Sequence, residues 1–275
     1  MKNFFYILIS AIIFSSCSEY QKALKASGEG ATAEKFKIGE KYYNEGEFSK
    51  ANALFAQIVP EYRGKPQAQK LMFLYSNSFY EMKDYYVASY QFERFASSYP
   101  KSEKVEEASY LSAKSAYHLS PIYSKDQTET KSAIDKIQEF INLFPDSKYV
   151  EEANVLVKEL EYKLEKKAFE IAKQFNHISD YPASIQSFTN FVFDFPGSKF
   201  REEASFYRLD SAYKLAINSY EFDRQKKPLK KIRLEAAKEY SDAFKVSHST
   251  STHIEDVEKM ALEITEQLKK YSTKS

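Results

Sequence analysis

Tryptophan is absent from this sequence, and cysteine occurs once, at Cys17. A single cysteine cannot form an intramolecular disulfide, so the fold must be stabilised by packing alone. Glycine and proline are sparse, with 6 and 8 positions in 275 residues, which is typical of a helical chain because both residues disfavour helix interiors. Acidic and basic side chains nearly balance, with a formal net charge of +1, so nothing indicates a nucleic-acid partner.

Catalytic motifs are missing as well. The four histidines, His118, His177, His248 and His253, are scattered and show no metal-binding spacing such as His-Glu-x-x-His. There is no glycine-rich phosphate loop, and the carboxylates mostly alternate with lysines, as in surface ion pairs. We therefore expect no enzyme, no metal site and no cofactor.

The longest apolar run lies at the N-terminus, where Phe4 to Phe14 follows Met1 and Lys2. It is too short for the ~20 residues that a membrane-spanning helix needs, and it has the pattern of a secretory signal peptide. Two small serines and then Cys17 follow it, which resembles a bacterial lipoprotein signal, although Phe14 stands where leucine is commonest. We expect a lipoprotein signal peptide over residues 1–16 and acylation of Cys17 as the membrane anchor; the alternative is an ordinary secretory signal.

Residues 17–33 show no apolar periodicity and include Gly28-Glu29-Gly30, which predicts a lipidated, flexible tether. Beyond it, one arrangement occurs three times: a helix-ending aromatic segment, a proline, a serine two residues later and then Glu-Glu-Ala. The prolines are Pro100, Pro145 and Pro196, and the serines are Ser102, Ser147 and Ser198. Proline cannot continue a helix, serine suits a helix cap, acidic residues favour a first turn, and alanine permits close helix approach.

The spacing of small and aromatic residues around these motifs matches the tetratricopeptide repeat. In the first unit the small residue is Gly39 and the aromatic is Tyr42, and Ala51 and Phe55 lie on the second helix. The sequence predicts an all-α tetratricopeptide-repeat α-solenoid of about five helix-turn-helix units over residues 34–225. Residues 226–275 should form C-terminal capping helices, at 229–244 and 253–271, and a short tail.

With the anchor signal in front, these repeats resemble the BamD family of tetratricopeptide-repeat lipoproteins. The matching segments are Tyr42 to Phe48, Asp126-Gln127-Thr128, Phe144 to Tyr149, the helix through Leu160 and Ala168, and Tyr181 to Ile185. The resemblance implies an outer membrane protein assembly factor on the periplasmic face of the outer membrane. Its implied partners are the barrel-assembly subunit, unfolded outer-membrane β-barrel proteins with an aromatic-ended C-terminal signal, and the membrane through Cys17.

The first helix of each repeat should line a concave face, and the pattern places aromatic and amide side chains there. We expect a substrate groove formed by Phe36, Tyr43, Asn44, Phe73, Asn77, Tyr80, Tyr110 and Tyr117, with Glu40, Lys70, Glu81 and Lys114 nearby. Rings, amide donors and lysines suit a peptide with a terminal aromatic and a carboxylate. Packing of the rings between helices is the competing interpretation.

The last full unit is the implied contact for the barrel-assembly subunit, with Arg201, Arg208, Asp210 and Tyr213 as interface candidates. The basic run from Lys226 to Arg233 is more typical of a solvated loop and helix start than of a lipid-binding segment. Two other functions stay open: a repeat lipoprotein that coordinates the envelope or cell wall, and a glycan-binding module. A coordinating lipoprotein usually carries a coiled coil before its repeats, but residues 18–33 show no heptad pattern. A glycan-binding module of this type typically uses tryptophan platforms, and the chain has no tryptophan.

Overall fold

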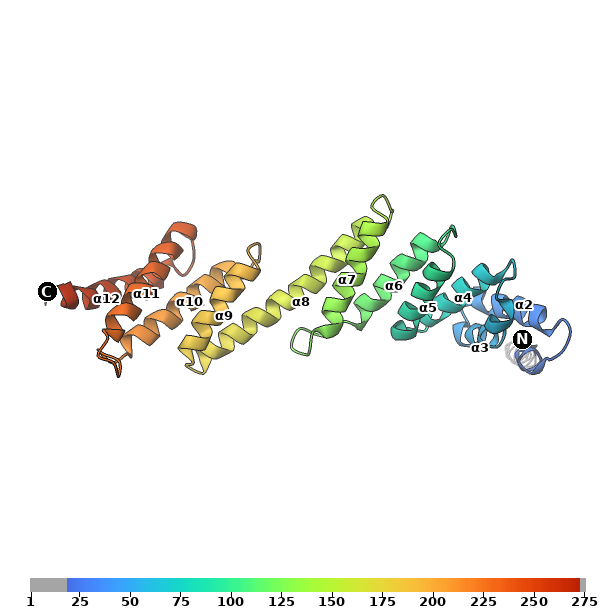
Figure 1. Ribbon diagram of the computed structural model, residues 1–275, viewed down its shortest axis with the longest axis horizontal. Helices are drawn as coiled ribbons and strands as arrows, with labels where there is room; N and C mark the ends of the chain where they lie inside the picture. Colours follow the sequence, from blue (N-terminus) through green and yellow to red (C-terminus); the bar gives the residue numbers. More distant parts are fainter. Residues whose placement is uncertain (1–18, 273–275) are drawn as a thin grey trace, which may run out of the picture. The chain divides into compact units, whose positions relative to one another are not determined.

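The computed structural model describes residues 19–272, and all regular elements in this range are helices (Figure 1). They are α2 (Ala31–Asn44), α3 (Phe48–Ile58), η1 (Val59–Tyr62), α4 (Ala68–Glu81), α5 (Tyr85–Ser98), α6 (Val105–Leu119), α7 (Thr128–Leu143), α8 (Val150–His177), α9 (Tyr181–Asp194), α10 (Arg201–Ile217), α11 (Leu229–Ser247) and α12 (Ile254–Ser272). The all-α repeat fold is confirmed. The signal peptide and Cys17 lie outside the described residues, and within them no helix has the length and apolarity to cross a membrane.

The chain divides into two compact units, residues 1–161 and 162–275, and α8 begins in the first and ends in the second. In the first unit the helices pack as the pairs α2–α3, α4–α5 and α6–α7. In the second unit α10 packs against both α9 and α11, and α11 packs against α12.

Small residues lie where paired helices cross, and large apolar residues fill the space opposite them. Gly39, Ser76, Ala113 and Ala172 are buried at the crossing points. Their counterparts on the second helices, Phe55, Phe92, Ile137 and Phe188, are almost fully buried. This alternation fixes the distance between the helices of each pair, as the repeat pattern predicts.

The first helices of successive repeats also contact one another in the first unit, α2 with α4 and α4 with α6. The second helices α5 and α7, in contrast, are separated by a groove. The first helices therefore form one continuous surface, called the inner face below, and the second helices lie on the outer side.

The predicted tether is wrong for residues 19–25, which form a helix. Ala23 is fully buried in the first hydrophobic cluster, and the ring of Tyr20 meets that of Tyr42 edge-on at 5.7 Å. Tyr20, Ala23 and Leu24 follow helical spacing, but a stripe of three residues is too short to stand out as a periodic pattern.

The sequence suggested that the repeat serines cap the helices directly. In the structure they do not. The hydroxyls of Ser147 and Ser198 accept the backbone N–H two residues further on, both at 3.1 Å, and the helices begin one residue after those donors. Each hydroxyl also donates to a carboxylate in the first helix of the previous repeat: Ser147 to Glu106 and Ser198 to Glu165, both at 2.6 Å. These bonds tie consecutive first helices together.

Ser251 repeats this arrangement near the C-terminus, since it accepts the N–H of His253 at 3.1 Å and donates to Glu202 at 2.6 Å. Accordingly α11 pairs with α10 as the second helix of the fifth repeat, and α12 stands where a sixth repeat would begin. The predicted capping region thus contains half a repeat and one closing helix.

Candidate functional site

Three lysines on the inner face of the first unit lie over aromatic rings, and each is paired with a carboxylate. Lys104 lies 5.1 Å from the Phe73 ring centre and 2.6 Å from Glu107. Lys114 lies 5.5 Å from the Tyr110 ring centre and 2.8 Å from Glu152.

The third lysine, Lys70, lies 5.9 Å from the Phe36 ring centre and forms an ion pair with Glu40. Each of these three sites combines a cation, a ring and an acid, and we call them the lysine–ring–carboxylate sites. The amide of Asn77 donates to the Tyr43 hydroxyl at 2.5 Å, which joins α4 to α2. Burial raises the pKa of Tyr43. Asn44, by contrast, is exposed and makes no side-chain hydrogen bond within the part of the chain described here.

Hydroxyl groups continue the inner face towards α8. Tyr117 donates to Glu159, and this bond raises the pKa of Tyr117 to about 12. Burial raises the pKa of Tyr80, whose ring lies edge-on to that of Tyr85 at 5.5 Å. The hydrogen bond from Lys114 and the nearby hydroxyl of Tyr110 lower the pKa of Glu152. Glu152 is therefore held in its charged form.

Two predicted groove residues, Phe36 and Tyr110, serve as core packing and are only 6% and 3% exposed. Phe73 is half-buried, with its ring 5.8 Å from that of Phe92. The prediction of Phe36 and Tyr110 as open groove contacts is corrected, because the repeat pattern indicates which face a residue lies on but not how deep it sits. Tyr43, Asn77, Tyr80 and Tyr117 do lie partly exposed on the inner face.

Sequence reasoning missed several of the charged partners on this face. Glu107 and Glu152 belong to the Glu-Glu-Ala motifs. Because acidic residues are expected in the first turn of a helix, nothing in the sequence indicated that they also pair with lysines. Lys104 lies in a turn two residues past the repeat serine, where a helical face cannot be assigned. No repeated lysine marks this position, because the residues equivalent to Lys104 in the next two motifs are Tyr149 and Phe200.

The four interface candidates of α10 do not form one patch. Arg201 donates to the Val192 carbonyl of α9 at 2.8 Å, and the Arg208 guanidinium lies 4.5 Å from the ring centre of Tyr240 in α11. Asp210 accepts from Asn176 of α8 at 2.8 Å, and Tyr213 donates to Glu263 of α12 at 2.5 Å. The two arginines and the other two residues thus occupy different sides of the helix, each with contacts inside the second unit.

A family described as outer membrane lipoprotein, YfiO, matches residues 29–229. The chain belongs to the YfiO family. Within residues 19–272 no group of three or more potential metal ligands occurs.

Two curated relatives resemble parts of this YfiO-family chain. A putative outer membrane protein assembly factor BamD of Aquifex aeolicus is 28% identical over 129 residues, which are 46% of this chain and 41% of the relative. The outer membrane protein assembly factor BamD of Helicobacter pylori is 24% identical over 99 residues, 36% of this chain and 45% of the relative. The chain thus spans less than half of either relative.

Among solved structures, the complex of the TPR2AB domain of yeast Sti1 with pHSP90 has a TM-score of 0.38 and 13% identity, and the match covers 86% of this chain and all of that one. A likeness of this degree carries no argument about partners.

Proposed function

We propose that this lipoprotein is an assembly scaffold for outer-membrane β-barrel proteins. In this role the inner face of the first unit receives the C-terminal signal segment of an unfolded barrel, and the second unit contacts the barrel-assembly subunit around Arg201, Arg208, Asp210 and Tyr213. Acylated Cys17 holds the chain on the periplasmic face of the outer membrane. Membership in the YfiO family and the names of the two relatives support this proposal.

The observation that carries the substrate half of the proposal is the set of three lysine–ring–carboxylate sites. A chain that ends in an aromatic residue brings a ring and a carboxylate together, which are the groups that each of these lysines already contacts. The terminal carboxylate can therefore exchange with Glu40, Glu107 or Glu152 without leaving a lysine unpaired. The exchange preserves the charge-assisted bond, and the added contact area comes from the rest of the segment.

Binding of a labelled peptide to the full chain tests this exchange. We expect a short peptide ending in phenylalanine with a free carboxylate to bind about tenfold more tightly than the same peptide with a terminal amide, because the amide cannot replace the charge-assisted bond. Changing Lys70, Lys104 and Lys114 together to glutamine should remove this preference. The matched control changes Lys238, Lys245 and Lys259, which are paired with Asp242 and Asp256 in the second unit. Equal affinity for the two peptides would argue against the inner face as a carboxylate receptor.

Recovery of the acylated protein from gently solubilised envelopes tests the scaffold half. We expect a stoichiometric β-barrel subunit with periplasmic domains among the bound proteins, identified by mass spectrometry. Recovery of cell-wall synthesis proteins without a barrel subunit would instead support a role in envelope or cell-wall coordination. Arg201→Ala and Arg208→Ala are the next variants to compare, with unfolding measured in parallel because both side chains also contact neighbouring helices.

A further inference from the structure

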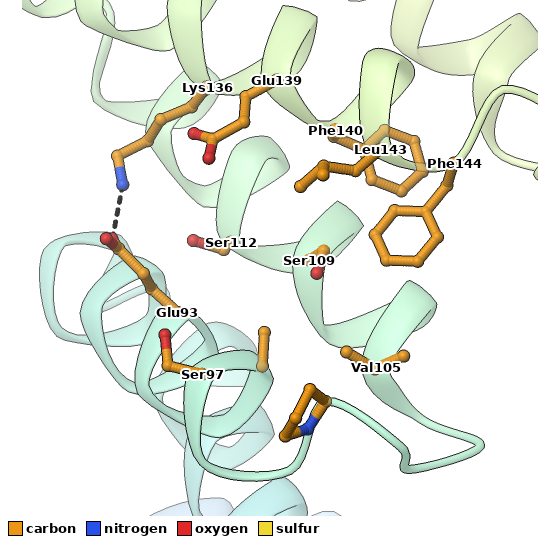
Figure 2. A pocket seen from close by; sticks show the side chains of 12 residues that line it. Glu93, Ser97, Val105, Ser109, Ser112, Lys136, Glu139, Phe140, Leu143 and Phe144 are labelled. Atoms are coloured by element: carbon orange, nitrogen blue, oxygen red, sulfur yellow. Dashed lines mark hydrogen bonds and ion pairs between the residues drawn. The ribbon is translucent and has the colours of Figure 1, made fainter.

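A groove of about 370 Å³ lies on the outer side of the first unit, opposite the inner face, and the proposed function does not use it. Its walls are α5 and α7, and its floor is α6. Figure 2 shows the ion pair of Glu93 with Lys136 towards one end and Phe140, Leu143 and Phe144 towards the other. Leu143 is 63% exposed, so an accessible apolar side chain borders the groove.

The repeats explain why the groove is open. The equivalent floor positions are Met72 in the preceding repeat and Ser109 in this one, counted from the crossing residues Ser76 and Ala113. The corresponding cavity of the preceding repeat, lined by Met72 and Arg94, measures only about 70 Å³. Small serines thus leave space where another repeat places a long side chain.

In the fifth repeat, arginines stand at two other positions of this lining, those of Val105 and Ser112. The shared Glu-Glu-Ala motifs align Val105 with Arg201 and Ser112 with Arg208. Arg208 lies against Tyr240 of α11, and Tyr240 occupies the position equivalent to Lys136. Arg201 donates to a backbone carbonyl of α9. The chain itself therefore shows that a groove of this kind accommodates arginine side chains, which contact both flanking second helices.

The open groove also differs in charge from the equivalent grooves of the preceding and fifth repeats. The position of Arg94 in the preceding repeat is held by Glu139 here, as the alignment of Phe95 with Phe140 shows. Glu93 is neutralised by Lys136 at 2.6 Å. Glu139 is exposed, and within residues 19–272 its carboxylate makes no ion pair or hydrogen bond. The open groove thus carries an unpaired acid where a filled groove carries an arginine.

We propose that this outer groove is a docking site for a partner protein segment that inserts an arginine flanked by apolar residues. The guanidinium pairs with Glu139, the aliphatic stem lies over Ser109 and Ser112, and a flanking apolar residue covers Leu143. An arginine can form two parallel bonds to one carboxylate, so the site discriminates it from lysine and from neutral side chains.

Methyl NMR of the full chain tests the proposal, with Leu143 and Val105 as reporters. The probe is a short peptide, blocked at both ends, with a central Leu-Arg-Leu; its control carries citrulline, which has the same shape without the charge. We expect saturable shifts of both reporters with the arginine peptide and binding on the order of tenfold weaker with citrulline. Equal shifts with the two peptides, or none at either reporter, would overturn the proposal.

Two variants sharpen this result. Glu139→Arg places the residue of the preceding repeat at an exposed position, so it should fold normally and abolish the shifts, whereas Glu139→Gln should weaken them. The matched control is Glu170→Arg, at an exposed position within α8 of the second unit. The triple lysine variant of the inner face should bind the arginine peptide unchanged, so failure of the substrate proposal and failure of this one are distinguishable. Unaltered binding by Glu139→Arg would contradict the assignment of the acid.

Discussion

Residue size at the helix crossings decides how closely the repeat helices pack. Gly39 holds the crossing point of α2 with α3, where the later repeats have Ser76, Ala113 and Ala172. A Cβ added at Gly39 would lie 2.6 Å from a ring carbon of Phe55, which is itself fully buried. The ring has no free space to move into, so this crossing requires glycine although the others tolerate a larger residue.

We therefore expect Gly39→Ala to destabilise the first unit. Alanine is the better helix former by about 1 kcal/mol, but overpacking a full core costs about 1–3 kcal/mol. The expected net loss is on the order of 1 kcal/mol in the free energy of unfolding, measured by chemical denaturation. Gly197→Ala is the control, because a Cβ there meets nothing within 4 Å. Equal stability of wild type and Gly39→Ala would mean that Phe55 can reorient.

The same scale shows how far the site could be predicted. Asn77 was predictable, because an amide on the inner face needs a partner and finds the Tyr43 hydroxyl. The depth of Phe36 was not, because its ring contacts Tyr62 and Lys70, which lie outside its own helix. The outer groove could not be predicted from one repeat alone. It becomes visible only when Ser109 is compared with Met72 and Ser112 with Arg208, the larger residues at the equivalent positions of other repeats.

At the scale of the element, the repeat motif predicted the helices well and their connections less well. The closing helices were expected at 229–244 and 253–271 and occur at Leu229–Ser247 and Ile254–Ser272. The role of α11 was missed because His248 and Ser249 stand where the earlier motifs have an aromatic and a proline. The hydrogen bond of Ser251 to Glu202 preserves the repeat geometry without that proline. A contact between residues far apart in sequence therefore identifies the repeat that its local pattern conceals.

At the scale of the whole molecule, each unit has hydrophobic clusters of its own. In the second unit, α11 and α12 cover the apolar side of α10, where Ala212 and Ala216 pack with Leu234, Ala237 and Ile264. The family match ends at residue 229, so these two helices lie almost entirely beyond it. They are part of the core of the second unit in this chain, whatever further role they have.

Removal of residues 229–275 should consequently affect the two units differently. Without α11 and α12, the buried side of α10 meets water, and loss of this apolar contact weakens α9 and α10. Hydrogen exchange measured by mass spectrometry should show at least about tenfold faster exchange in the peptides of α9 and α10. Peptides of α2 to α7 serve as the internal control and should keep their protection, because their clusters contain no residue of the deleted segment. Uniform loss of protection across all helices would mean that the chain unfolds as one cooperative body, and unchanged protection of α10 would mean that α11 and α12 only cover an already stable helix.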